Sequence, residues 1–325
     1  MVNYKKALAL MLALIIAFCL ASCTKQGTDD AERTTNPEEM SYADDDPDAV
    51  RTGLGIICDV RMSEDVEDTS RRDVVSTVAA VTTDYEGRII SAEIDELRLE
   101  LNAKNGLELT DVKTVGEGDG EWREKVDAFE EYISGMNSGE IDALIDYLSG
   151  QPVDEKLKVV CDMDLGNIVK AVRQAIGESH ARGAESNDEL KLLMSAYKSD
   201  DGSDDNVIYV IDYAALTLNN KGEITSSSLD ESECGLTLSG NEFADYPGAY
   251  RTNKSLGEQY GLKKNSSIHR EWDEQIAAYE SYITGKKPAE LSDGYDSDGI
   301  TTDEELRELC TLDLRHIAEN ISKAG

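Results

Sequence analysis

Cysteine and histidine are the residue types best suited to metal binding or nucleophilic chemistry, and this sequence contains few of them. No CxxC pair occurs, and the cysteine spacings match no zinc site. Three isolated histidines also argue against a histidine-based metal centre or catalytic triad. We therefore predict no metal site, no catalytic residues and a protein that is not an enzyme. Apart from Cys19 and Cys23 near the N-terminus, the residues concerned are Cys58, Cys161, Cys234, Cys310, His180, His269 and His316.

An acidic segment near the C-terminus comes closest to a metal-binding motif. Asp296, Asp298 and Gly299 fit positions three, five and six of a calcium-binding loop, and Glu305 fits position twelve. Position one is then Gly294, which has no side-chain ligand atom. Because the motif is broken at its first ligand, a solvated turn is favoured over a calcium site.

The N-terminus has the parts of an export signal in the expected order. Lys5 and Lys6 precede an uncharged apolar run, Ala7–Leu20, which is shorter than the roughly 18 residues of a membrane-spanning helix. The run ends in Leu20-Ala21-Ser22-Cys23, which resembles the bacterial lipobox. In such signals the peptidase cuts before the cysteine, whose sulfur carries diacylglycerol. We predict a signal peptide over residues 1–22 and lipidation of Cys23, with an ordinary signal peptide or a buried apolar helix as the alternatives.

Lipidation implies an extracytoplasmic protein anchored to the cell membrane, because each buried acyl methylene contributes about 0.8 kcal/mol. The formal net charge is −35, from 32 Lys+Arg and 67 Asp+Glu. Such a charge repels nucleic acid and anionic membrane surfaces, so nucleic acid is excluded as a partner. A solvated surface is favoured over acidic patches that collect cations.

Two polar stretches divide the chain. Residues 23–50 are acidic, with almost nothing apolar, and read as a disordered tether. Residues 181–206 end in the acidic segment Ser199–Asn206 and read as a linker. We therefore expect one folded domain over residues 51–180 and a second over residues 207–325.

The two domains are indicated by an internal repeat. The segment Val75–Asp95 aligns with Val210–Asp230 at an offset of 135 residues. Further on, Glu121-Trp122 aligns with Glu271-Trp272 at an offset of 150, and Cys161 aligns with Cys310 at 149. The change in offset places about fifteen extra residues in the second copy, around Asn241–Lys264. Three blocks recurring in the same order indicate two homologous domains.

Each copy has the same pattern of elements. A strand turns near Gly87 or Gly222 and returns as a second strand, which is a hairpin signal, and the alternation of Leu97, Leu99 and Leu101 suggests a third strand. An amphipathic helix follows each hairpin and ends before Gly135 or Gly285, where a left-handed C-cap is expected. A closing helix follows, with Asp164 or Asp313 placed to cap it. Strands followed by helices predict an α+β class, with each small domain an antiparallel sheet packed by helices.

The two tryptophans are the candidate ligand contacts. Trp122 and Trp272 each begin the apolar stripe of a helix, where a core role is favoured, although an indole could stack on a planar ligand. Glu121 and Glu271 precede them and would meet only if the two domains faced each other. As acids in a first turn they suit the helix dipole. Cys161 and Cys310 are expected to be buried thiols.

The hairpin and the Glu-Trp helix carry a family resemblance. With the closing segment, residues 53–176 and 207–324 resemble clostridial-type lipoproteins with domains related to the FMN-binding domain of flavinylated electron-transfer proteins. Flavinylated members carry Ser/Thr-Gly-Ala-Thr before the last helix, and its final threonine takes FMN through a phosphoester. The matching stretches here, Leu157–Gly166 and Leu306–Arg315, lack that signature, and only Thr311 supplies a hydroxyl.

These observations predict a membrane-anchored lipoprotein with two degenerate FMN-binding-like domains. We expect a non-enzymatic module that binds a small molecule or a protein and carries no covalent cofactor. The alternative is an extracytoplasmic electron-transfer protein that holds FMN noncovalently, with Trp122 or Trp272 against the ring.

Overall fold

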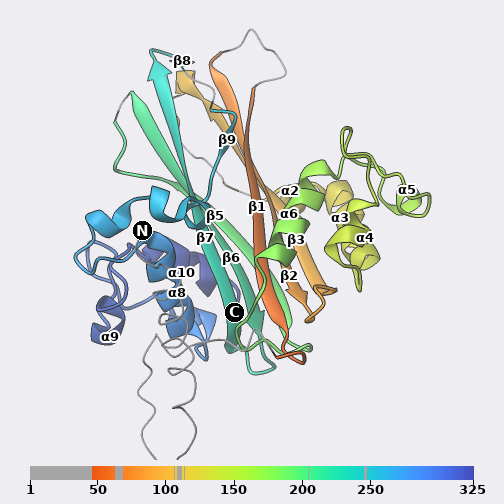
Figure 1. The fold of residues 1–325 in the computed structure, drawn as a ribbon. Helices are drawn as coiled ribbons and strands as arrows, with labels where there is room; N and C mark the ends of the chain where they lie inside the picture. The colour runs from red at the N-terminus through yellow and green to blue at the C-terminus, as the bar shows by residue number, and fades with distance from the viewer. Residues whose placement is uncertain are drawn as a thin grey trace, which may run out of the picture. The chain divides into compact units, whose positions relative to one another are not determined.

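Two antiparallel sheets, with helices on their outer faces, form the described part of the computed structural model (Figure 1). The model describes residues 46–62, 69–105, 107, 112, 114–203, 205–244 and 247–325. The predicted signal peptide, Cys23 and the predicted tether up to residue 45 lie outside the described residues. The described residues all belong to a single unit that spans residues 41–325.

The first half begins with a three-stranded meander. Strands β1 (Arg51–Met62), β2 (Arg71–Thr83) and β3 (Ile89–Asn102) pair in sequence order, and β4 (His180–Ala181) and β9 (Ala249–Tyr250) pair with β1. The segments after β3 that belong to this half are η2 (Ala103–Asn105), α2 (Val115–Gly118), α3 (Gly120–Ile133), α4 (Ser138–Asp142), α5 (Leu157–Val160) and α6 (Gly166–Gly177).

The second half repeats this order. Strands β5 (Glu189–Lys198), β6 (Asn206–Leu218) and β7 (Ile224–Ser239) form the second meander, and β8 (Glu242–Phe243) pairs with β7. The helical segments that follow are α7 (Asn253–Leu256), η3 (Gly257–Gln259), η4 (Leu262–Lys264), α8 (Trp272–Ile283), η5 (Pro288–Glu290), α9 (Glu304–Arg307) and α10 (Arg315–Ser322). The α+β class with two sheet-and-helix halves is confirmed.

The hairpins of the two halves agree residue by residue. Thr83 pairs with Ile89 after a bulge in the first sheet, and Leu218 pairs with Ile224 after the corresponding bulge in the second. The turns place Gly87 at φ 71° and Gly222 at φ 73°, a backbone conformation that glycine adopts without a steric cost. Both pairs of positions differ by the 135 residues of the sequence repeat, so the repeat corresponds to equivalent strands.

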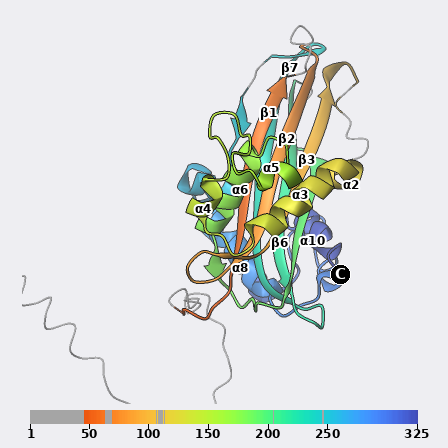
Figure 2. The ribbon, with the colours of Figure 1, turned by 90° about the vertical axis from the view of Figure 1, so that its right-hand side faces the viewer.

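Four layers result from the way the strands alternate (Figures 1 and 2). On β2, Val78 and Ala80 face the second sheet, whereas Ala79 and Val81 face α3 and α6. The second sheet likewise packs its outer face against α8 and α10. The inner faces of the two sheets meet in one shared hydrophobic core, so the halves are not separately packed domains.

Two expectations about elements need correction. The predicted linker, 181–206, contains β5, which pairs with β6 along its whole length. The residues Leu97, Leu99 and Leu101 belong to the single long strand β3 and face the shared core, so the third strand of the first sheet is β1. In both cases the strand is held by pairing and burial that a local pattern does not reveal.

The extra residues of the second half lie mainly after α7. Thr114 bridges to Leu97 ahead of α2, and Thr252 bridges to Ser232 ahead of α7, an offset of 138 residues. From there to the Trp-bearing helix the offset rises to 150, so about twelve of the extra residues lie between α7 and α8. Tyr260 and Leu262 of this insertion pack against the second helical core.

Candidate functional site

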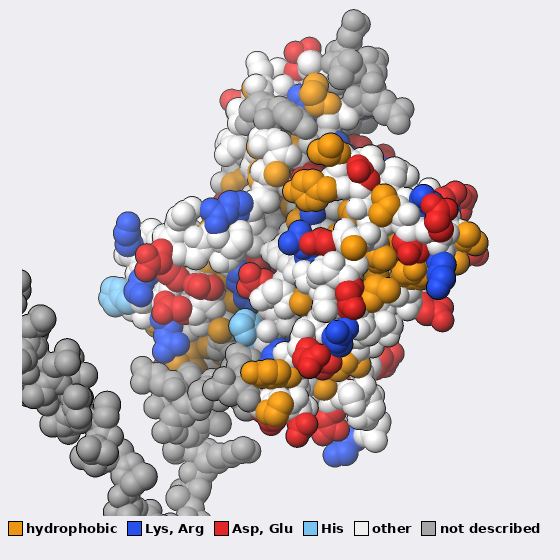
Figure 3. All heavy atoms as spheres, turned by 45° about the vertical axis from the view of Figure 1, so that its right-hand side comes forward, with side chains coloured by type: hydrophobic (Ala, Val, Ile, Leu, Met, Phe, Trp, Pro, Cys, Tyr) orange, Lys and Arg blue, Asp and Glu red, His pale blue; other side chains and the backbone are white. Residues whose placement is uncertain are grey.

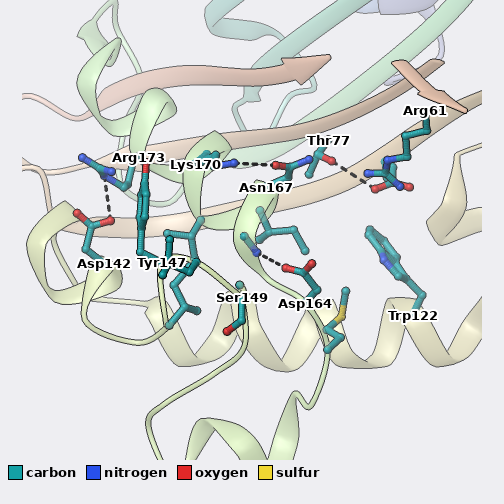
Figure 4. Close-up of a pocket in the computed structure, with 18 of the residues that line it drawn as sticks. Arg61, Thr77, Trp122, Asp142, Tyr147, Ser149, Asp164, Asn167, Lys170 and Arg173 are labelled. Carbon is teal, nitrogen blue, oxygen red and sulfur yellow. Dashed lines mark hydrogen bonds and ion pairs between the residues drawn. The ribbon is translucent and has the colours of Figure 1, made fainter. Parts of the chain in front are cut away.

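A cavity of about 770 Å³ opens on the outer side of the first half, between α3 and α6 (Figure 4). Thr77 of β2 and Glu96 of β3 form part of its wall, where the Thr77 hydroxyl donates to the Glu96 carboxylate at 3.3 Å. Its volume falls within the roughly 300–1,000 Å³ of small-molecule sites. Nearby exposed apolar side chains gather on the lobe that carries α5 (Figure 3), namely Tyr147, Leu148, Val159 and Val160.

The two tryptophans occupy equivalent helix positions but different surroundings. Trp272 is 2% exposed and belongs to the second helical core. Trp122 is only partly buried, and its ring lines the cavity (Figure 4). The guanidinium of Arg123 lies 5.7 Å from the Trp122 ring centroid, within cation–π range. The structure therefore separates a core residue, Trp272, from an indole that a ligand can reach, Trp122.

Cations outnumber carboxylates in the cavity wall. Three carboxylates line it, those of Glu96, Asp142 and Asp164, against four basic side chains. Two of the cations hold fixed positions, because Arg98 pairs with Glu96 at 2.9 Å and Arg173 pairs with Asp142 at 3.0 Å. The wall is thus locally positive on a chain whose overall formal charge is −35. The four cations are Arg61, Arg98, Lys170 and Arg173.

The N-terminus of α6 forms another part of the wall. Asp164 accepts a hydrogen bond from the Gly166 amide at 2.8 Å, but the N-cap residue of α6 is Leu165, not Asp164 as predicted, and it makes no side-chain cap hydrogen bond. The Leu165 amide donates to the Gly150 carbonyl at 2.9 Å and fixes the preceding loop against the helix. Gly150 has φ +70°, and a Cβ there would lie 1.9 Å from the Asp164 carboxylate, so a side chain is excluded. Glycines at 150 and 166 thereby keep the helix N-terminus open.

The equivalent region of the second half is filled. The Leu314 amide donates to the Gly299 carbonyl at 3.0 Å, which matches the Leu165–Gly150 contact. Arg315 stands where the first half has Gly166, and its guanidinium contacts Asp313 at 2.8 Å and the Ser297 carbonyl at 3.1 Å. The arginine side chain therefore lies across the space that Gly166 leaves free.

The charge of the sheet surface also reverses between the halves. By the strand register, Thr77 and Glu96 correspond to Asp212 and Glu231, and Arg98 corresponds to Glu233. Glu233 accepts a hydrogen bond from the Tyr260 hydroxyl at 2.6 Å, a residue that the first half lacks. The sheet surface of the second half is therefore acidic at the positions where the first half has Thr77 and Arg98.

The stretches matched to the flavin-attachment signature have different environments. Met163, Asp164 and Gly166 of the first stretch line the cavity. In the second stretch the Thr311 hydroxyl donates to Gln275 at 3.1 Å, and the Gln275 side chain is fully buried. The only hydroxyl in the two stretches is thus held inside the second half, away from the cavity.

The other residues singled out in the sequence, two cysteines and two glutamates, either pack in a core or make contacts within their own half. Cys161 and Cys310 are both fully buried, one in each helical core, and burial raises the pKa of the Cys310 thiol to about 12. Glu121 pairs with Lys125 at 3.0 Å, and Glu271 accepts from the Leu262 amide at 2.9 Å. The two glutamates lie in helical layers on opposite faces of the paired sheets, so they do not meet.

The acidic segment near the C-terminus forms a turn. Asp296 accepts hydrogen bonds from the amides of Asp298 and Ile300 at 3.0 and 3.1 Å. Over the residues that the structure describes, no group of three or more His, Cys, Asp or Glu side chains is arranged to hold a metal ion.

No local sequence pattern predicts the basic residues of the cavity or the loop before α6. Four basic residues spread over β1, β3 and α6 have no common spacing. A signal was nevertheless present: at the offset of 149 residues Gly166 aligns with Arg315, and Asn167 aligns with His316. Where two repeats otherwise match, positions with different residues indicate that the two copies have acquired different roles.

Comparisons with protein-family models, curated proteins and solved structures found no match. Within the described residues, no helix combines the length and the apolar character needed to cross a bilayer.

Proposed function

We propose that this protein is an extracytoplasmic, lipid-anchored binding protein that takes a small ligand in the cavity of its first half. In the second half the Arg315 side chain occupies the corresponding space. The observation that carries the proposal is the Trp122 ring, which lines an open cavity while its counterpart Trp272 is buried. A large aromatic side chain left accessible in a concave, partly apolar site is typical of ligand binding. No catalytic role is assigned to any residue.

The cavity wall favours a ligand with a flat ring and an anionic group. The Trp122 indole offers a stacking surface, and Arg61, Arg98 and Lys170 offer positive charge. Ile145 and Met163 add apolar surface to the same wall. The ring would stack on Trp122, and the anionic group would face α6, where the helix dipole adds positive potential.

A flavin held noncovalently is the second candidate, and it would make the protein an electron carrier. Two observations favour it: the partly buried Trp122 indole that lines the cavity, and the position of Met163, Asp164 and Gly166 at the cavity. These residues belong to the stretch that aligns with the attachment signature of the flavinylated proteins. FMN combines a planar ring with a phosphate, and it is therefore the first ligand to test.

The fluorescence of Trp122 provides a direct assay of ligand binding. The chain has two tryptophans, so Trp272→Phe leaves Trp122 as the only indole. We expect FMN to quench its fluorescence with saturation, and riboflavin, which lacks the phosphate, to bind at least tenfold more weakly. Trp122→Phe in the natural background should abolish the saturable quenching. A visible absorbance spectrum of protein purified from its own host would test whether a flavin is bound there.

The contribution of the basic wall is tested by a matched pair of charge reversals. Lys170→Glu lies in the cavity wall, whereas Lys158→Glu lies on α5, outside it. We expect at least a tenfold loss of affinity for an anionic aromatic ligand from the first change and less than a twofold loss from the second. Equal effects, or no response of Trp122 to FMN and to a panel of anionic aromatic compounds, would refute the proposed site.

A further inference from the structure

Two cysteines from different halves of the chain face the same buried space. Cys58 lies on β1 and is 3% exposed, and Cys234 lies on β7 and is fully buried. Both belong to the hydrophobic core that the two sheets share, and both are free thiols in this structure. Residues that are 176 positions apart in the sequence are thus brought together by the packing of one sheet on the other.

The neighbours of Cys58 show how closely the sheets approach at this point. Ser76 is the β2 partner of Cys58 in the strand register, and its hydroxyl lies 2.7 Å from the hydroxyl of Tyr213 on the opposite sheet. On the other side Cys58 pairs with Tyr250, whose hydroxyl donates to the Gly235 carbonyl at 2.5 Å. Gly235 directly follows Cys234, so hydrogen bonds between the two sheets flank both cysteines.

The two thiols also influence each other's protonation. Cys234 has the largest influence on the Cys58 thiol and lowers its pKa, whereas burial raises it. Strands β1 and β7 also contain Cα pairs within 8 Å of one another, closer than the roughly 10 Å between typical stacked sheets. Disulfides need Cα separations of roughly 4.4–6.8 Å, and one such bond joins the two sheets of immunoglobulin domains.

We propose that Cys58 and Cys234 form a disulfide that joins the two halves of the protein. A low-molecular-weight disulfide is the oxidant. The Cys58 thiolate attacks one of its sulfurs, which releases one thiol and leaves a mixed disulfide on Cys58. The Cys234 thiolate then attacks the Cys58 sulfur and releases the second thiol. Two electrons pass to the oxidant, and the two protons of the protein thiols end on the released thiols.

Burial determines when this exchange takes place. The folded core excludes an oxidant from both sulfurs, so the bond forms before the sheets close over them. Once formed, it is shielded from reductants by the same burial. An extracytoplasmic protein folds in surroundings that permit such oxidation. The proposal does not depend on that location, because the full chain can be refolded with oxidised glutathione.

Cys161 and Cys310 provide an internal control. Each is fully buried, but they lie in the two helical cores on opposite faces of the paired sheets. They therefore cannot join one another within one molecule.

The test is peptide mapping of the full chain after refolding with oxidised glutathione. The protein is unfolded in excess alkylating agent without reductant and then digested with trypsin. We expect the peptide of residues 52–61 to be linked to that of residues 222–251, with Cys161 and Cys310 alkylated. Alkylation of Cys58 and Cys234, together with Cys161 and Cys310, before reduction would overturn the proposal.

Stability gives a second, independent measurement. Reduction should lower the melting temperature of the oxidised protein by roughly 5–15 °C, because the bond closes a loop of more than a hundred residues. Cys58→Ala should remove this dependence on reductant, and Cys161→Ala should retain it. If Cys58→Ala does not fold, the peptide map of the unmodified chain remains decisive.

Discussion

Gly166 and Arg315 begin the equivalent helices α6 and α10, and only Arg315 places a side chain across the end of the helix. The backbone contact before each helix is the same, since Leu165 and Leu314 donate to Gly150 and Gly299 at 2.9 and 3.0 Å. The guanidinium of Arg315 reaches the Ser297 carbonyl at 3.1 Å. This substitution is therefore one of the differences between the open first half and the closed second half.

Replacing Gly166 with arginine should close the cavity. The new guanidinium can pair with Asp164 as Arg315 pairs with Asp313 at 2.8 Å. A Cβ at Gly166 would lie 3.1 Å from the Asp164 carboxylate, a contact that a small shift relieves. Arginine also has the better helix propensity, so stability should change by less than about 1 kcal/mol. We expect at least a tenfold loss of FMN affinity in the fluorescence assay.

Gly120→Arg is the matched control for this change. Gly120 is the first residue of α3, and a Cβ there meets nothing within 4 Å. The same charge is added beside the same lobe without entering the cavity. If both variants bind FMN like the unmodified protein, the cavity at α6 is not the binding site.

The tryptophans should differ in their contribution to stability. Trp272 is 2% exposed, so Trp272→Ala should cost about 3–5 kcal/mol, as for large aromatics removed from a packed core. Trp122 is partly buried beside the cavity, and Trp122→Ala should cost only about 1–2 kcal/mol. Equilibrium urea unfolding measures both values. Equal costs would place Trp122 in the core and remove the main support for the site.

Much of the fold could be predicted because the two copies reinforce each other. The hairpins, the Trp-bearing helices and the closing helices recur at fixed offsets with their apolar spacing intact. Strand β5 was missed because it shares little with its counterpart β1. Gly53 and Gly55 of β1 lie against α6, where a Cβ would fall 1.9 Å from a helix carbonyl oxygen. The matching positions of β5 are Lys191 and Leu193, since α10 imposes no such close approach.

The site could be predicted only in part. The repeat drew attention to both tryptophans, but equal positions suggested equal roles. What distinguishes them lies in other elements: the loop before α6, the insertion after α7, and the charges of β3 and β7. The face-to-face packing of the sheets could not be predicted either, because an apolar strand face indicates burial but not which surface covers it.

The lipid anchor remains a prediction, since Cys23 lies outside the described residues. Cys23→Ala should yield a protein that is not labelled by fatty acid in the producing bacterium and that leaves the membrane fraction. The folded part should be unaffected, because β1 begins only at Arg51. Fatty-acid labelling and fractionation test this. Persistent label and membrane association in the variant would exclude the lipobox interpretation.

The buried acids of the second half should make stability depend on pH. The Asp212 carboxylate is fully buried on β6, where it accepts from the Ser195 hydroxyl at 3.1 Å and lies beside Glu231. Burial raises the pKa of Asp212 from 3.8 to about 7. Burial and the neighbouring Asp212 likewise hold the pKa of Glu231 well above its ordinary value.

The sign of the effect follows from proton binding. Between pH 4 and 7 the folded protein holds a proton on Asp212 that the unfolded chain has released, so rising pH favours unfolding. The stabilisation is complete below the unfolded pKa and is lost as pH passes about 7. Glu280 acts in the opposite sense: burial raises its pKa, but Lys254 and Arg182 outweigh burial and lower it. Its contribution is lost in acid.

Asp212→Asn separates these effects, because the amide fits the same space and does not titrate. Relative to the unmodified protein, the variant should gain on the order of a few kcal/mol of unfolding free energy between pH 5 and pH 8. Asp201→Asn, on an exposed loop, is the control and should change the pH profile little. Urea unfolding at a series of pH values gives the comparison. A difference between Asp212→Asn and the unmodified protein that stays constant over this range would show that Asp212 is ionised throughout in the folded protein.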